Sequence, residues 1–153
     1  MKGLTATRFR KVLGAALLGV HGTLALWASA GLVELVMPAP PWPAVRNPEL
    51  PDGLLVVHWL AMLGAGSVFL VGYLTRWPTT PRVMAAAYVS LATICAVETF
   101  GFLTNASRFV NMGVEYATYA ILIALLHNAP LKNRFRRAPD SATPRRAIGH
   151  RHP

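Results

Sequence analysis

The fold of this chain follows from VMAAAYVSLATICAVETFGFL (residues 83–103), TNASR (104–108) and FVNMGVEYATYAILIALL (109–126). The two long segments are apolar runs of about 20 residues, the length that an α-helix needs to cross ~30 Å of hydrocarbon. The short connector predicts that the two helices are antiparallel neighbours. Each run contains one carboxylate, Glu98 or Glu115. An ionisable residue within a membrane span is by default a candidate functional residue.

The composition is typical of a membrane protein. Of the 153 residues, 54% are hydrophobic and only 14% are charged, whereas soluble domains carry about 25% charged residues. Two further apolar runs precede the first segment, and the second of them carries Gly64, Ala65 and Gly66 at its centre, where we expect close helix packing. We predict an all-α integral membrane protein with four transmembrane helices in an antiparallel bundle, over residues 12–37, 54–76, 83–104 and 109–128.

The basic residues are distributed unevenly between the connections. Thirteen of the 15 Lys and Arg residues lie within 1–11, 76–82 and 132–151, and the other two are Arg46 and Arg108. Cytoplasmic segments of membrane proteins carry such an excess, so we predict that both termini are cytoplasmic and that the protein lies in the cell inner (plasma) membrane. This topology explains the net charge of +9, and we predict no nucleic-acid partner.

Three segments outside the spans complete the organisation. Residues 38–53 hold six of the 12 prolines and are predicted to form a stiff external loop. Residues 129–153 are predicted to form a disordered, basic cytoplasmic tail, which would bind anionic lipids next to the membrane through Lys132, Arg134, Arg136 and Arg137. Residues 1–30 also resemble a cleavable signal ending in Ala28-Ser29-Ala30, but the apolar run continues to Met37 and favours a retained span.

Polar residues gather in the outer half of the predicted membrane. At 1.5 Å per residue, Glu98 lies roughly 24 Å from the cytoplasmic end of its helix, and Glu115 lies about 10 Å below the outer end of its own. Asn111, Glu115 and Tyr119 recur every four residues and share one helix face. We predict a polar, acidic pocket whose ligand-binding residues are Glu98, Glu115, His58, Glu34, Asn111 and Tyr119. Purely structural roles are the alternative, with Glu34 at the interface, His58 in packing and the carboxyls linking helices.

Metal and cofactor sites have little support. The span histidines His21, His58 and His127 lie at mid-membrane, outer and inner depths, whereas two haem ligands must lie at one height on facing helices. Carboxylates and imidazole would suit a divalent ion, but there is no local metal-ligand motif. We predict no cofactor and no metal.

Three classes of function remain open. The leading prediction is a protein that binds or transports a small molecule or cation in the outer pocket. The second is a non-catalytic accessory subunit that docks onto a larger membrane complex or onto copies of itself. The third is a membrane enzyme that acts on a lipid-soluble substrate by proton transfer.

The enzyme alternative has a family resemblance. Residues 96–104, AVETFGFLT, resemble the acidic third helix of the EXPERA-type group of sterol isomerases and the sigma-2 receptor, and His21 falls where the first helix of that group can carry histidine. The resemblance implies a four-span fold with a carboxyl and a histidine as acid and base. The chain departs from that group because the second acid of the first helix is missing and because its second helix offers His58 instead of Glu.

Overall fold

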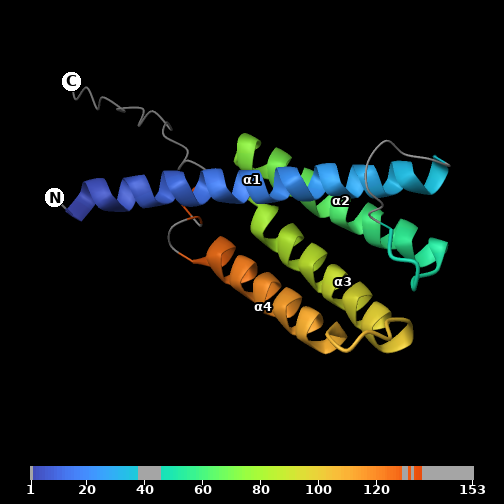
Figure 1. Ribbon diagram of the computed structural model, residues 1–153. Coiled ribbons are helices and arrows are strands. Elements are labelled where there is room, and N and C mark those ends of the chain that lie inside the picture. The colour runs from blue at the N-terminus through green and yellow to red at the C-terminus, as the bar shows by residue number, and fades with distance from the viewer. Residues whose placement is uncertain (1, 38–45, 129–130, 132, 136–153) are drawn as a thin grey trace, which may run out of the picture.

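The computed structural model describes residues 2–37, 46–128, 131 and 133–135. Within these ranges the chain is all-helical and forms α1 (Lys2–Val36), α2 (Asp52–Thr75), α3 (Thr80–Gly101) and α4 (Arg108–His127) (Figure 1). All four helices are long and apolar enough to cross a membrane. The prediction of an all-α protein with four membrane-spanning helices is therefore confirmed at this level. The external loop residues 38–45, Lys132 and the tail 136–153 lie outside the described residues.

Local sequence explains where the helices begin. α2 follows Pro51, whose extended backbone precedes the helix, and its first turn carries Asp52, which suits the positive end of the helix dipole. α3 has Pro81 in its first turn, where a missing N–H costs no hydrogen bond. α1 begins at Lys2, ten residues before the predicted span. Residues 2–11 contain no proline, so the helix continues from the apolar run into the basic lead.

The helix ends follow equally simple rules. α2 ends at Thr75, and the next residue, Arg76, adopts the left-handed conformation with φ 56° and donates its backbone N–H to the Gly72 carbonyl. This is the αL arrangement that commonly ends a helix. The next residue, Trp77, also donates its N–H to the Gly72 carbonyl, at 2.9 Å. α3 and α4 are then joined by residues 102–107.

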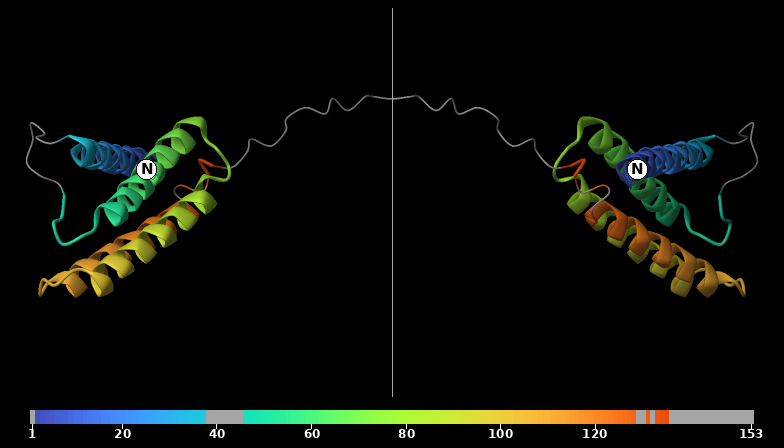
Figure 2. Two further views of the ribbon diagram at one scale, coloured as in Figure 1. Left: turned by 90° about the vertical axis from the view of Figure 1, so that its right-hand side faces the viewer. Right: turned by 90° about the vertical axis from the view of Figure 1, so that its left-hand side faces the viewer.

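Consecutive helices pack on one another, α1 on α2, α2 on α3 and α3 on α4. Figures 1 and 2 show α3 and α4 lying side by side, with α1 and α2 crossing on one side of this pair. The central core combines aromatic and aliphatic side chains, including Phe69, Met84 and Tyr88. α4 is the most peripheral helix, and its buried residues are Leu122 and Leu126.

Small residues allow the close approach of α1 and α2. A Cβ added at Gly66 would lie 2.9 Å from the His21 carbonyl oxygen, and one at Gly31 would overlap the Trp59 indole. The expected close packing at the centre of α2 is confirmed for Gly66, whereas Gly64 has open space beside it. A glycine is therefore required at Gly66 by contact with a neighbouring helix.

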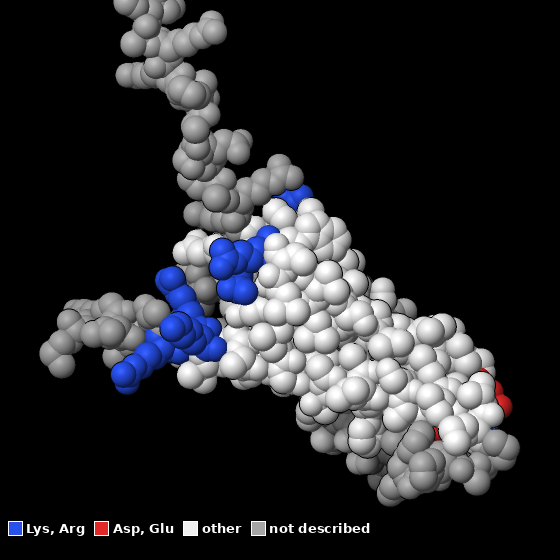
Figure 3. Space-filling model, turned by 90° about the horizontal axis from the view of Figure 1, so that it is seen from above, with Lys and Arg blue, Asp and Glu red and all other residues white. Residues whose placement is uncertain are grey.

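Charge separates the two ends of the structure (Figure 3). Most of the described Lys and Arg residues gather where α1 begins and where α2 and α3 are joined, and acidic residues lie at the opposite end, together with Arg46 and Arg108. The chain after α4 returns to the basic end, where Leu131 and Phe135 are buried in the core. These described residues, within the predicted tail, are packed against the helices.

Candidate functional site

A short polar contact joins α2 to α3. His58 Nδ1 lies 2.6 Å from Glu98 Oε1, and the Glu98 residue is only 7% exposed. Both residues were expected at the same outer depth from the sequence. The imidazole therefore supplies the partner that a buried carboxyl needs.

Glu115 of α4 has partners of a different kind. The Tyr119 hydroxyl donates a hydrogen bond to Glu115 Oε2 at 3.1 Å, as their i, i+4 spacing allows. Cys95 of α3 lines the same cavity as Glu115. Among the described residues, no Lys, Arg or His forms an ion pair with Glu115.

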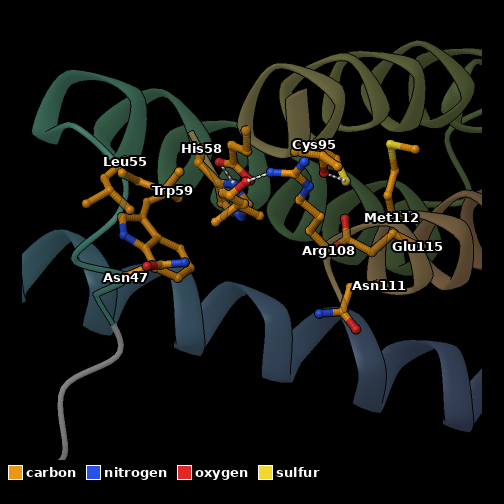
Figure 4. Close-up of a pocket in the computed structure, with 13 residues that line it drawn as sticks. Asn47, Leu55, His58, Trp59, Cys95, Arg108, Asn111, Met112 and Glu115 are labelled. Carbon is orange, nitrogen blue, oxygen red and sulfur yellow. Dashed lines mark hydrogen bonds and ion pairs between the residues drawn. The ribbon is translucent and has the colours of Figure 1, made fainter. Parts of the chain in front are cut away.

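These groups line a polar cavity of ≈ 210 Å³ between α2, α3 and α4. Figure 4 shows His58 reaching this space from α2, and Arg108 and Glu115 reaching it from α4. Four of the six predicted binding residues line the cavity, and the complete lining is Asn47, Leu50, Leu55, His58, Trp59, Cys95, Glu98, Thr99, Leu103, Arg108, Asn111, Met112 and Glu115.

Arg108 is a site residue that the sequence prediction missed. Its guanidinium donates a hydrogen bond to the Leu103 carbonyl and lies 4.8 Å from the centre of the Phe109 ring. It had been treated only as a charge in an external connection. Its spacing from Asn111 and Glu115, three and seven residues, places all three on one face of α4, and this signal could have identified it.

A second cavity of ≈ 300 Å³ adjoins the first and reaches α1. His58 and Glu115 line both cavities. The rest of the second cavity is largely apolar, with Val20, Leu24 and Leu122 among its lining residues. Glu115 therefore lies between a polar cavity and a largely apolar one.

The polar end of the second cavity is organised by His21 and two tyrosines. His21 Nδ1 lies 2.7 Å from the Leu17 carbonyl oxygen, so Nδ1 must be the donor. His21 Nε2 lies 2.6 Å from the Tyr88 hydroxyl oxygen. The Tyr88 ring stacks on Tyr119 with centroids 5.6 Å apart, and Tyr119 lines this cavity rather than the first.

Glu34 lies apart from the other predicted residues. Its Oε2 accepts a hydrogen bond from the Arg46 backbone N–H at 3.2 Å, and it lines neither cavity. The structure therefore brings Glu98, Glu115, His58 and Asn111 together around the polar cavity, places Tyr119 next to them, and leaves Glu34 at the loop. Within the described ranges, no group of three or more His, Cys, Asp and Glu side chains is placed to hold a metal ion.

Comparisons with protein-family models, with curated proteins and with solved structures find no match for this chain. The resemblance of residues 96–104 to the EXPERA-type group stays a prediction.

Proposed function

We propose that this chain is a multi-pass protein of the plasma membrane that binds a small molecule with a cationic group, at the polar cavity between α2, α3 and α4. The observation that carries the proposal is the position of Glu115, which lines both cavities and makes no ion pair with a described basic residue. A carboxylate is costly to hold in low-dielectric surroundings. A bound cation would neutralise the Glu115 carboxylate.

The other charged groups of the cavity are already engaged. Glu98 contacts His58 at 2.6 Å, and the Arg108 guanidinium is held by the Leu103 carbonyl and the Phe109 ring. Glu115 is thus the carboxyl at which a cation meets the least competition. An apolar part of the same ligand would occupy the second cavity, whose lining is mostly hydrophobic, as is common for small-molecule sites.

The proposal includes an antiparallel bundle with both termini in the cytoplasm. Its support is the gathering of Lys and Arg at one end of the helices (Figure 3), which is the charge asymmetry of cytoplasmic membrane faces. The polar cavity then lies in the outer half of the membrane. A reporter active only in the cytoplasm, fused after Pro153, should give signal, and silence from a stably expressed fusion would contradict the orientation.

Cys95 provides a direct test of the cavity, because it is the single cysteine of the chain and lines the polar cavity. Purified protein is labelled with a trimethylammonium methanethiosulfonate and, separately, with its sulfonate counterpart. We expect the cationic reagent to be favoured in the native protein. A charge within a few ångströms contributes on the order of 1 kcal/mol or more, so Glu115→Gln should lower the cation-to-anion rate ratio about tenfold.

Because both reagents react with the same thiol, any change in its intrinsic reactivity cancels in the cation-to-anion rate ratio. The matched control is Glu34→Gln, which removes a carboxylate that lines neither cavity and should leave the ratio unchanged. An equal fall in both variants, or no fall in Glu115→Gln, would contradict the proposed cation site. Failure of both reagents to reach Cys95 in the native protein would contradict an accessible cavity.

A role as an accessory subunit is the second candidate, and the sparse burial of α4 favours it. The buried residues of α4 are Leu122 and Leu126, while Phe109, Val114 and Ile121 are exposed. Such a face suits lipid or another membrane-spanning chain. Mass measurement of the protein extracted in mild detergent distinguishes the two, since a stoichiometric complex would promote this candidate.

A further inference from the structure

A third cavity lies at the basic end of the structure, away from the two cavities described above. It has a volume of ≈ 260 Å³ and is lined by Arg10 of α1, Tyr73 of α2, and Leu131, Asn133 and Arg134 from the chain after α4. Its polar side chains include two guanidinium groups and an amide. Among the described residues, no carboxylate lines it.

The returning chain is held firmly enough to position Arg134. Leu131 and Phe135, on either side of it, are 2% and 3% exposed, and the Phe135 ring meets the Tyr73 ring edge-on at 6.2 Å. The Arg134 guanidinium lies 4.2 Å from the centre of the Tyr73 ring, and its Nη2 donates to the Tyr73 carbonyl at 3.2 Å. One nitrogen of the guanidinium is therefore committed to the end of α2.

The remaining hydrogen-bonding capacity of this site is unused within the described residues. Arg134 Nε is buried and has no hydrogen-bond partner in the part of the chain that the structure describes. Leaving a buried donor of a charged group unpaired is costly. Arg10, across the cavity, forms no ion pair with a described acidic residue.

Counter-charges are absent from this end of the described structure (Figure 3). The five acidic residues that the structure describes are Glu34 and those of the loop and the first cavity, Glu49, Asp52, Glu98 and Glu115. The basic end carries Arg8, Arg10, Lys11, Arg76, Arg82 and Arg134. A neutralising group for the third cavity must therefore come from outside the described chain.

We propose that the third cavity binds a phosphate group, presented either by the headgroup of an anionic phospholipid or as free phosphate. Guanidinium groups match phosphate oxygens with paired, charge-assisted hydrogen bonds, and the Asn133 amide adds a neutral donor. Arg10 and Tyr73 belong to helices that we propose to cross the membrane, so a phospholipid headgroup would be the nearest abundant phosphate. It is separate from the proposed cation site, and either can exist without the other.

The test uses the purified full-length protein and native mass spectrometry in mild detergent. The protein is incubated with phosphatidylglycerol, with phosphatidylcholine, or with phosphatidylglycerol plus millimolar inorganic phosphate. We expect one phosphatidylglycerol to be retained in preference to phosphatidylcholine. Arg10→Gln should weaken this retention by about tenfold, the effect of losing a hydrogen bond to a charged group.

The matched control is Arg8→Gln, which removes the same charge from the same helix end at a position that does not line the cavity. It should retain the lipid as the native protein does. In one outcome, inorganic phosphate displaces phosphatidylglycerol from the native protein and from Arg8→Gln but not from Arg10→Gln. That result would identify free phosphate as a ligand of the same site. Equal losses in the two variants would show diffuse attraction to the basic end and overturn the proposal. Equal retention of both lipids by the native protein would also overturn it.

Arg10 is exposed, so its replacement should leave the fold intact. Arg134→Lys serves as the second variant, because it keeps the charge and loses the forked geometry. We expect it to reduce phosphatidylglycerol retention as well. Full retention in both Arg10→Gln and Arg134→Lys, with unchanged melting temperatures, would exclude a phosphate bound between these residues.

Discussion

His58 of α2 and Glu98 of α3 meet at 2.6 Å, between Nδ1 and Oε1, and their side chains are 18% and 9% exposed. This contact links the helix pair α1 and α2 to the helix pair α3 and α4, at the depth of the polar cavity. Removing one member of a buried polar pair leaves the other without a partner, which costs more than removing both. The coupling between the two residues can therefore be measured as a difference in the free energy of unfolding between single and double variants.

We predict that His58 and Glu98 are coupled in stability. Replacing either by Ala should lower the free energy of unfolding by about 2–3 kcal/mol. The double variant should cost less than the sum, by about 1 kcal/mol or more. The measurement is a double-mutant cycle of unfolding in mixed micelles. His127→Ala is the control, because His127 contacts its own helix at the Ile123 carbonyl. Strictly additive costs for His58 and Glu98 would contradict the coupling.

We predict that Gly66 is needed for the contact of α1 with α2. Gly66→Ala places a Cβ 2.9 Å from the His21 carbonyl oxygen, so the helices must shift and stability should fall by about 1–3 kcal/mol. Gly64→Ala, two residues away, meets nothing within 4 Å and should be neutral or slightly stabilising. Thermal unfolding in detergent compares the two variants. Similar melting temperatures for both would contradict a close approach at Gly66.

We predict a pH-dependent link between the α1–α2 connection and the α3–α4 connection. Hydrogen bonds from the Thr104 backbone N–H and hydroxyl, at 3.0 Å and 2.9 Å, lower the pKa of Glu49 below its ordinary value of 4.5. A group whose pKa is lower in the folded state stabilises that state above its ordinary pKa. This contribution is lost as the pH falls through the lowered value.

The expected result is that Glu49→Gln melts at a lower temperature than the native protein at neutral pH. The difference should shrink as the pH falls below 4.5. Thr104→Val keeps the backbone donor and removes the hydroxyl, so it should show an intermediate difference. A gap between native protein and Glu49→Gln that is constant from neutral to acid pH would contradict this assignment.

The four helices were predictable because span length and apolar composition are properties of the sequence alone. The break between the first two spans followed from the six prolines of residues 38–53. The helical extension of α1 back to Lys2 was not predicted, because hydrophobicity marks where a helix crosses lipid and not where it continues into water. The packing of Leu131 and Phe135 against the core was also not predicted, since two apolar residues in a basic segment carry no periodic signal.

The position of the site residues along each helix was predictable from the sequence, but the direction in which each helix faces was not. Residue spacing sets the height of His58, Glu98 and Glu115 along their helices, and the structure does place all three around one cavity. The contact of Tyr119 with Glu115 follows from their i, i+4 spacing. The choice of His58 as the partner of Glu98, by contrast, depends on how each helix is turned. That angle comes from tertiary packing, which one sequence does not encode in a readable pattern.

The last prediction is that Glu98 and Glu115 act as a coupled pair in selecting a cation. They line one cavity from α3 and α4, together with Cys95. Because residues that share a cavity are expected to be energetically coupled, their effects on the cation-to-anion labelling ratio at Cys95 should not multiply. The ratio in Glu98→Gln/Glu115→Gln should fall less than the product of the two single falls. Glu34→Gln combined with Glu115→Gln is the control, and there the factors should multiply, because Glu34 lines neither cavity. If the Glu98 and Glu115 factors also multiply, the two carboxyls are independent, and Glu98 serves only to bind His58.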